Sequence, residues 1–102
     1  METPYYVVIF TSRKSADQQG YAEIAARMQT LCNAQPGFLK MIHSTSDEGE
    51  SITSCYWQDL VSISAWKANA EHQAAQEQGI ARWYDEFQIE IARIERAYYW
   101  KR

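Results

Sequence analysis

The first stretch of the chain with a clear pattern is hydrophobic at odd and even positions alike. From Tyr5 to Ser12 the residues are mostly β-branched or aromatic, which predicts a strand that is buried on both faces. A pair of helices from the same chain can cover only one of these faces. A second subunit is the simplest cover for the other face.

Hydrophobic residues then change to a helical spacing. Ser15-x-x-Gln18 has the form of a capping box, so we expect a helix to begin in this region and to run to about Asn33. Pro36-Gly37 marks its end. The apolar positions of this helix recur at steps of three and four: Tyr21, Ile24, Ala25, Met28, Leu31 and Cys32.

A hairpin is predicted next. One strand covers Phe38–Ser46, a polar loop with Gly49 covers residues 47–50, and the return strand covers Ile52–Trp57. Alternation along the first of these strands places Leu39, Met41 and His43 on one side and Phe38 and Ile42 on the other.

The second half of the chain predicts a further helix region and a final strand. Asp59 is a plausible N-cap for a helix through Asn69, and a short helical turn then ends at Gly79. Residues 80–84 are read as either one more turn or an ordered loop. A long last strand is expected over Phe87–Tyr99, and the shift of its apolar phase between Ile91 and Ile94 would suit a β-bulge.

The order of these elements is β-α-β-β-α-β, which is the ferredoxin-like arrangement of the α+β class. It predicts a four-stranded antiparallel sheet with helices on one face, in a single domain over residues 1–102. Because the first strand is apolar on both faces, we expect two sheets to pack face to face as a dimeric α+β barrel. The end of the final strand, Tyr98-Tyr99-Trp100, is placed to clasp the partner of such a homodimer.

Composition narrows the function. With 46% hydrophobic and 23% charged residues, the chain resembles an ordinary soluble globular protein. An aromatic content of 14% suggests a lined cavity, a subunit interface, or both. The net charge of −3 argues against a nucleic-acid partner. The start of the chain looks like neither a signal peptide nor a membrane span, so the cytoplasm is the expected location.

The residues offer little for a metal or a bound cofactor. Cys32 and Cys55 fit no disulfide framework or zinc motif and are expected to be buried, reduced thiols. The commonest hydrolase, nucleotide and dinucleotide motifs are absent from the sequence. No third histidine or acidic cluster accompanies His43 and His72, so chemistry without a cofactor is the more natural interpretation.

His72 is the leading candidate for proton transfer, because an imidazole titrates close to neutral pH. The competing interpretation is a histidine that is merely exposed or satisfied within the core, and it applies to His43 at least as strongly. Trp57 and Trp66 more often anchor a small core than bind a ligand.

Six short segments of the chain form a familiar set in this order: Pro36-Gly37-Phe38, Tyr56-Trp57-Gln58-Asp59-Leu60, Ala65-Trp66-Lys67, Asn69-Ala70-Glu71-His72, Ala75-Gln76 and Trp83-Tyr84. Together they resemble the antibiotic biosynthesis monooxygenase (ABM) domain family of the dimeric α+β barrel superfamily. The likeness covers essentially the whole chain.

This resemblance implies a dimer with a pocket in each subunit between sheet and helices. It also implies a cofactor-free monooxygenase that oxidises a small electron-rich aromatic substrate, such as a quinol or an anthrone, with O₂. The substrate anion reduces oxygen in that chemistry, and the protein supplies a dry pocket, a proton acceptor and donors. Trp66 would then be a pocket wall and donor, His72 the acid or base, and Asn69 an orienting amide.

Three other functions are weighed against this one, and one of them is a pure assembly module whose pocket is closed by aromatic packing. A haem-degrading branch of the superfamily uses an Asn on the first strand and a His about ten residues after the Trp. Here the first strand has no Asn and the tenth residue after Trp66 is Gln76, so haem degradation is disfavoured. A dimeric protein that binds a small molecule, for instance in a stress response, without catalysing a reaction is the main alternative.

Overall fold

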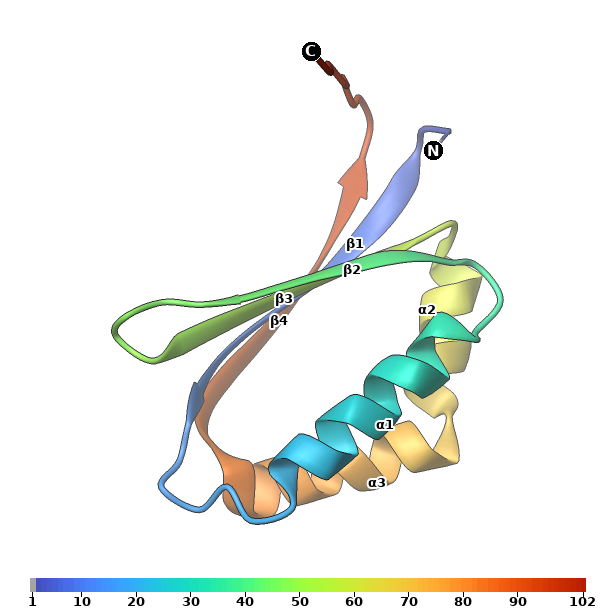
Figure 1. The fold of residues 1–102 in the computed structure, drawn as a ribbon. Coiled ribbons are helices and arrows are strands. Elements are labelled where there is room, and N and C mark those ends of the chain that lie inside the picture. The colour runs from blue at the N-terminus through green and yellow to red at the C-terminus, as the bar shows by residue number, and fades with distance from the viewer. Residues whose placement is uncertain (1) are drawn as a thin grey trace.

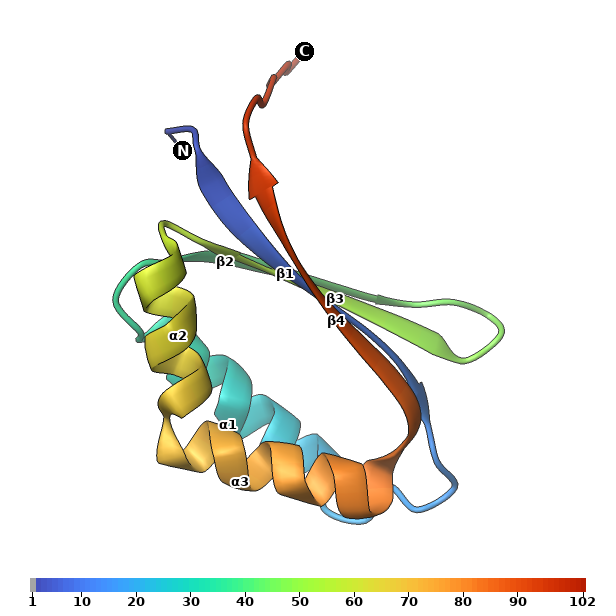
Figure 2. The ribbon, with the colours of Figure 1, turned by 180° about the vertical axis from the view of Figure 1, so that it is seen from behind.

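The computed structural model describes residues 2–102 and has the predicted order of elements. The sheet is antiparallel with strand order β2-β3-β1-β4. All helices lie on one face of this sheet, and the other face is left open (Figures 1 and 2). The predicted α+β, ferredoxin-like subunit is therefore confirmed. Its elements are β1 (Tyr5–Lys14), α1 (Tyr21–Asn33), β2 (Phe38–Thr45), β3 (Glu50–Trp57), α2 (Leu60–Ala68), α3 (Ala70–Gln78), the π-helical turn η1 (Gly79–Trp83) and β4 (Tyr84–Ile94).

The pairing register shows which side chains share the helix-facing side of the sheet, because directly paired residues point to the same face. One row across the sheet contains Met41, Cys55, Val8 and Ile91. The next row, farther from α2, contains His43, Thr53, Phe10 and Ile89.

The hydrophobic core lies at one end of this side, where the sheet meets α1 and α2. Its buried centre is Trp57, Cys32 and Ile63, and Trp57 is fully buried. Partly buried neighbours complete the cluster: Tyr6, Val8, Phe38, Met41, Cys55 and Trp66. Burial of so many large side chains at one place provides the main stabilisation of a domain of this size.

The residues before α2 and α3 determine where each helix begins. The carboxylate of Asp59 accepts a hydrogen bond from the backbone N–H of Ser62 at 2.8 Å, which confirms the predicted N-cap. The helix predicted to run through Asn69 ends at Ala68, and the extended backbone of Asn69 separates α2 from α3, close to where the sequence predicted a break. The predicted short turn after it is a helix of nine residues.

The predicted capping box is wrong. Helix α1 begins only at Tyr21, after Gly20 in the left-handed region with φ 79°. The side chain of Ser15 instead contacts the carbonyl of Arg82, and the Gln18 amide donates to the carbonyl of Trp83 at 2.9 Å. These two residues tie the loop between β1 and α1 to η1, so their spacing serves a tertiary contact.

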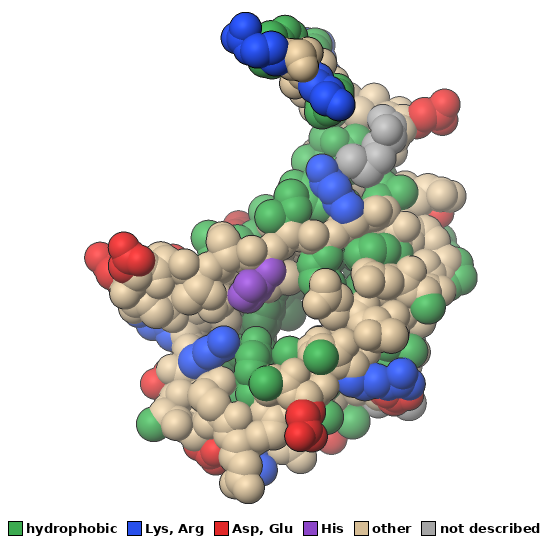
Figure 3. All heavy atoms as spheres, in the orientation of Figure 1, with side chains coloured by type: hydrophobic (Ala, Val, Ile, Leu, Met, Phe, Trp, Pro, Cys, Tyr) green, Lys and Arg blue, Asp and Glu red, His purple; other side chains and the backbone are tan. Residues whose placement is uncertain are grey.

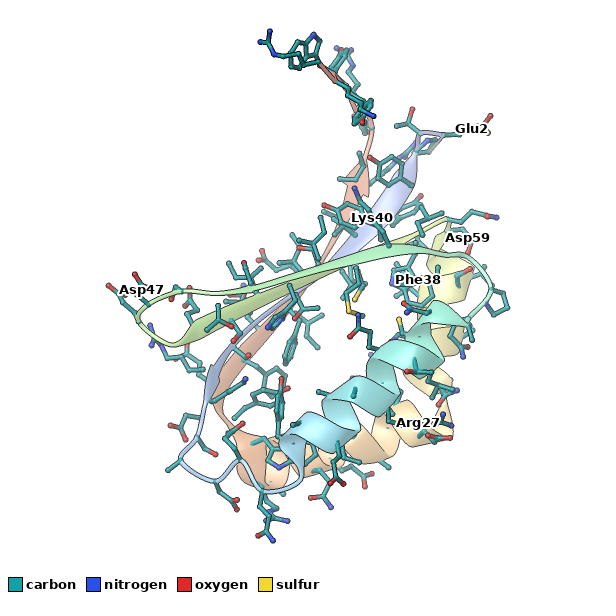
Figure 4. All side chains as sticks on the ribbon, viewed as in Figure 1. Glu2, Arg27, Phe38, Lys40, Asp47 and Asp59 are labelled. Atoms are coloured by element: carbon teal, nitrogen blue, oxygen red, sulfur yellow. The ribbon has the colours of Figure 1, made fainter. Side chains whose placement is uncertain are left out.

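The predicted faces of β2 are wrong at its start. The register shifts between Phe38 and Lys40, and this one-residue slip moves Phe38 to the same side as Met41. Figure 4 shows Phe38 pointing toward the helices and Lys40 pointing away from them. The ammonium group of Lys40 lies over the ring of Tyr56 on the open face.

The final strand also differs from its prediction. It starts at Tyr84 and ends at Ile94, and residues 95–102 form no strand in this single chain. The bulge predicted between Ile91 and Ile94 is absent, because pairing with β1 is regular through that segment. The register shifts instead at the other end of β4, where Arg13 pairs with Glu86 and Lys14 with Tyr84. The ambiguous residues before β4 form the π-helical turn η1.

Candidate functional site

Trp66 and His72 form a stacked pair at the junction of α2 and α3. Their ring centroids are 4.2 Å apart and the ring planes differ by 13°. The break at Asn69 bends the chain between the two helices, and this brings both side chains together although they lie six residues apart. Trp66 also packs on Trp57, with 6.4 Å between ring centroids, so the pair is attached to the buried core.

The hydrogen bond of His72 fixes the tautomer of its ring. Nδ1 lies 2.9 Å from the backbone carbonyl oxygen of Trp66. A carbonyl can only accept, so Nδ1 carries the proton and donates it. In the neutral ring, Nε2 then has a free lone pair, and no hydrogen-bond partner for it is found among residues 2–102.

The environment of His72 favours this neutral form. Burial lowers the pKa of His72 below its usual value near 6.5, and the hydrogen bond to the Trp66 carbonyl offsets only part of that effect. A neutral imidazole with one nitrogen fixed and the other available can accept a proton near pH 7.

Asn69 has a structural task in this structure. Its side-chain oxygen accepts hydrogen bonds from the backbone N–H groups of Glu71 at 3.0 Å and His72 at 3.2 Å. These contacts satisfy the free donors of the first turn of α3. Asn69 therefore positions His72 through the backbone, and its Oδ1 is engaged in the cap.

The two thiols predicted to be buried both lie in the core cluster. They are free, with Cys32 buried and Cys55 partly buried. A hydrogen bond from Cys32 lowers the pKa of Cys55, whereas that same bond and burial raise the pKa of Cys32. The free thiols agree with the prediction from the sequence.

Open space occurs in two places on the helical side. A groove of about 540 Å³ runs between α1 and α3. The molecule is also hollowed between β2 and the helices, where hydrophobic side chains line the opening (Figure 3). The residues that line the groove between α1 and α3 are Ile24, Arg27, Met28, Glu71, Ala74, Ala75, Glu77, Gln78 and Ala81. Glu71 belongs to the lining of the groove, whereas His72 and Trp66 do not.

Within residues 2–102, no group of three or more His, Cys, Asp or Glu side chains could hold a metal ion. None of the helices in the same range is long and apolar enough to cross a membrane. The two histidines lie on different elements, His43 on β2 and His72 on α3.

Sequence reasoning missed one polar group of side chains. His43 and three hydroxyl residues on β2 and β3 contact one another on the helix-facing side of the sheet. Alternation placed His43 on a strand face, but its partners come from a neighbouring strand. The signal was the run of serines and threonines on both arms of the hairpin.

Comparisons with known proteins place the fold in a family. The family model described as "Antibiotic biosynthesis monooxygenase" matches residues 4–78. The uncharacterized protein YqjZ of Bacillus subtilis strain 168 is 42% identical over 95 residues, which covers 93% of this chain and 83% of YqjZ.

Solved structures agree in fold at low sequence identity. SnoaB, a cofactor-independent oxygenase from Streptomyces nogalater, is 10% identical with a TM-score of 0.78, and the match covers 91% of this chain and 95% of SnoaB. The protein SO0527 from Shewanella oneidensis is also 10% identical with a TM-score of 0.78, over 91% of this chain and 93% of its own. The family model covers well over half of the sequence, so this chain belongs to the antibiotic biosynthesis monooxygenase family.

Proposed function

We propose that this protein is a cofactor-independent monooxygenase that oxidises a small electron-rich aromatic compound, of the quinol or anthrone kind, with O₂. The observation that carries the proposal is the stacked Trp66–His72 pair, in which His72 has Nδ1 fixed and Nε2 available. Family membership supports the reaction class. The likeness of fold to SnoaB, whose description is a cofactor-independent oxygenase, is consistent with it.

In the first step of this reaction, the protein must remove one proton from the substrate. For an anthrone, Nε2 of His72 takes a proton from the activated methylene carbon, and the carbanion gives electrons to O₂. Carbon and oxygen join as a peroxide anion on that carbon, and the proton held on Nε2 of His72 passes to it to give the hydroperoxide. Loss of the second hydrogen with one oxygen atom as water leaves the ketone, so anthrone plus O₂ gives anthraquinone plus water.

Trp66 has two proposed parts in this step. Its ring stacks on the imidazole and limits the access of water to one face, which keeps His72 neutral through desolvation. Its carbonyl holds Nδ1–H, and the same bond stabilises the imidazolium after proton transfer. Asn69 contributes by capping α3 and thereby holding the backbone of His72.

The proposal includes a homodimer joined through the open face of the sheet. Ile42 and Ile52 lie on this face and are about half exposed in the single chain. The tail beyond β4 carries three highly exposed aromatic residues, Tyr98, Tyr99 and Trp100. Exposed apolar surface of this kind is typical of subunit contacts. Sedimentation equilibrium tests this part, and a monomer at micromolar concentration would contradict it.

Oxygen consumption with a panel of quinols and anthrones tests the reaction. His72→Ala is expected to lower kcat about 10²- to 10⁴-fold, the usual contribution of a general base. Gln73→Ala is the matched control, because Gln73 is the next residue on α3 and is exposed. If the two variants oxidise the substrate equally fast, the role of His72 is wrong.

A ligand-binding protein without catalysis is the second candidate. It is favoured by the engagement of Asn69, which leaves one of the three predicted site residues committed to a helix cap. Thermal stabilisation by quinones together with no oxygen consumption for any quinol or anthrone would establish this alternative.

A further inference from the structure

The helix-facing side of the sheet becomes polar beyond Cys55. Four side chains of β2 and β3 form what we call the hydroxyl cluster: His43, Thr45, Ser51 and Thr53. Nδ1 of His43 lies 2.7 Å from the Thr53 hydroxyl, and its Nε2 lies 3.5 Å from the Thr45 hydroxyl. The Thr45 and Ser51 hydroxyls are 3.1 Å apart.

A sheet face that packs on helices is normally apolar, so these residues are out of place for a core. They also retain hydrogen-bonding capacity. His43 and Thr45 are exposed, and 3.5 Å is the outer limit of a hydrogen bond. An oxygen atom of a ligand can therefore replace the weak contact at Nε2 without leaving a buried polar group unpaired.

An aromatic wall lies directly beside the hydroxyl cluster. Thr53 pairs with Phe10, and Phe10 pairs with Ile89 on the next strand. The ring of Phe10 contacts those of Tyr84 at 5.3 Å and Phe87 at 5.7 Å. Phe87 and Ile89 are 41% and 46% exposed although they lie on the helix-facing side. The helices therefore leave the Phe87 and Ile89 part of this wall uncovered.

The polar and apolar parts meet at the hollow under β2. Figure 3 shows that hydrophobic side chains line this hollow, and His43 lies on β2, the strand that borders it. Neighbouring strands are about 4.8 Å apart, so His43 on β2 and Phe10 on β1 are separated by about 10 Å. That span fits an aromatic system of two or three fused rings with an oxygen substituent at one edge.

We propose that the hydroxyl cluster is the polar end of a ligand site, which binds the phenolic oxygen of a fused-ring aromatic compound whose rings lie against Phe10 and Ile89. This inference deepens the proposed function and rests on it for the class of substrate. It assigns His43 and Thr53 to ligand binding and selectivity, whereas proton transfer stays with His72.

Binding of two matched probes tests the site without any turnover. 2-Hydroxyanthraquinone and 2-methylanthraquinone are nearly equal in size, and only the first has a phenolic hydroxyl. Both are already oxidised, so their dissociation constants, measured by quenching of tryptophan fluorescence, do not depend on catalysis. The wild-type protein is expected to prefer the hydroxyl compound.

Two variants should remove that preference. His43→Ala and Thr53→Val are each expected to raise the dissociation constant of the hydroxyl compound roughly three- to tenfold, as for the loss of one hydrogen bond. The dissociation constant of the methyl compound should not change. Ser44→Ala is the control, because Ser44 is the next residue on β2 and its side chain points to the opposite face. It should bind both probes as the wild type does.

The outcomes separate this inference from the proposed function. Loss of the preference in both variants supports the site, even if no quinol or anthrone is oxidised. Unchanged preference in both variants overturns it, even if oxidation depends on His72. Absence of binding of either probe to the wild-type protein overturns it as well. Melting temperatures of the variants equal to that of the wild type would show that the fold is intact.

Discussion

Two ends of one sheet face behave differently in this protein. At the end next to α2, Trp57 and Cys32 are almost completely buried. At the other end, Phe87 and Ile89 face the same helical layer but remain more than 40% exposed. We call these regions the packed end and the open end.

The difference follows from where the helices touch the sheet. The start of β2 approaches α2 so closely that only glycine fits at position 37, and α2 holds Trp66 against Trp57. At the open end, η1 and the loop after β1 hold the layers together through Ser15 and Gln18, and a hollow remains between the layers. The packed end thus provides stability, and the open end is where we propose that a ligand binds.

The largest expected effect compares one aromatic residue from each end. Trp57→Ala should lower the free energy of unfolding by about 3–5 kcal/mol, because it removes a fully buried side chain. Phe87→Ala should cost about 1 kcal/mol or less. Urea denaturation of both variants measures this, and equal losses would contradict the division into two ends.

Two glycines with positive φ sharpen the comparison. Gly37→Ala should cost about 2–4 kcal/mol, because its φ of 83° is unfavourable for alanine and the new methyl group would collide with the Ser62 side chain. Gly49→Ala, in the β2–β3 hairpin, has a φ of 85° but open space around it, so about 1 kcal/mol is expected. Adding Ser62→Gly to Gly37→Ala should recover part of the loss, and a purely additive result would show that the collision is unimportant.

Substitutions of Asn69 should have a smaller effect on stability, and they distinguish a role as the N-cap of α3 from a role as an active-site amide. Asn69→Ala should lower the free energy of unfolding by about 1 kcal/mol through loss of the cap. Asn69→Asp keeps an acceptor at the helix start and should retain both stability and oxidation rate. An active-site amide would predict the opposite for oxidation, since aspartate has no N–H to donate. Denaturation and oxygen consumption on both variants decide this.

The smallest expected effect is the pH dependence contributed by His72. Its pKa is lowered in the folded protein, so between that value and about 6.5 the unfolded chain binds more protons. Stability should therefore fall on acidification through this window and stay level above it as far as His72 is concerned. Melting temperatures at pH 7 and pH 5 for wild type and His72→Gln measure the contribution, which should be smaller in the variant.

The rate of the proposed oxidation should depend on the protonation state of His72 as well. A general base acts in its neutral form, so kcat/KM should rise with pH through the lowered pKa of His72 and reach its plateau by neutral pH. Activity that instead falls over this range would assign a protonated acid to the step.

Local sequence signals predicted the elements whose causes are local. Asp59 caps α2 as expected, and Pro36-Gly37 separates α1 from β2. The run from Tyr5, which is apolar on both faces, predicted the strand β1, and the order of elements predicted the ferredoxin-like fold. Each of these features depends on residues close in the chain, where backbone preference and hydrophobic period act directly.

The sequence pattern failed where distant segments meet. The spacing of Ser15 and Gln18 predicted a capping box, but both side chains bind η1, almost seventy residues away. Phe38 read as facing away from Met41, but a register shift against β3 reversed its face. The apolar phase of β4 misplaced its bulge for the same reason, since the shift is fixed by pairing with β1. Strand register belongs to two chain segments, and one segment alone does not determine it.

The candidate site divides in the same way. The sequence by itself predicted Trp66, Asn69 and His72 as site residues through the resemblance to the family, and it determined the fold that carries them. Only the tertiary structure showed that Trp66 stacks on His72, that Asn69 caps α3 and that His43 contacts Thr53 on the neighbouring strand. Residue type sets what a side chain can do, but its neighbours, and therefore its hydrogen bonds and protonation, exist only after the layers have packed.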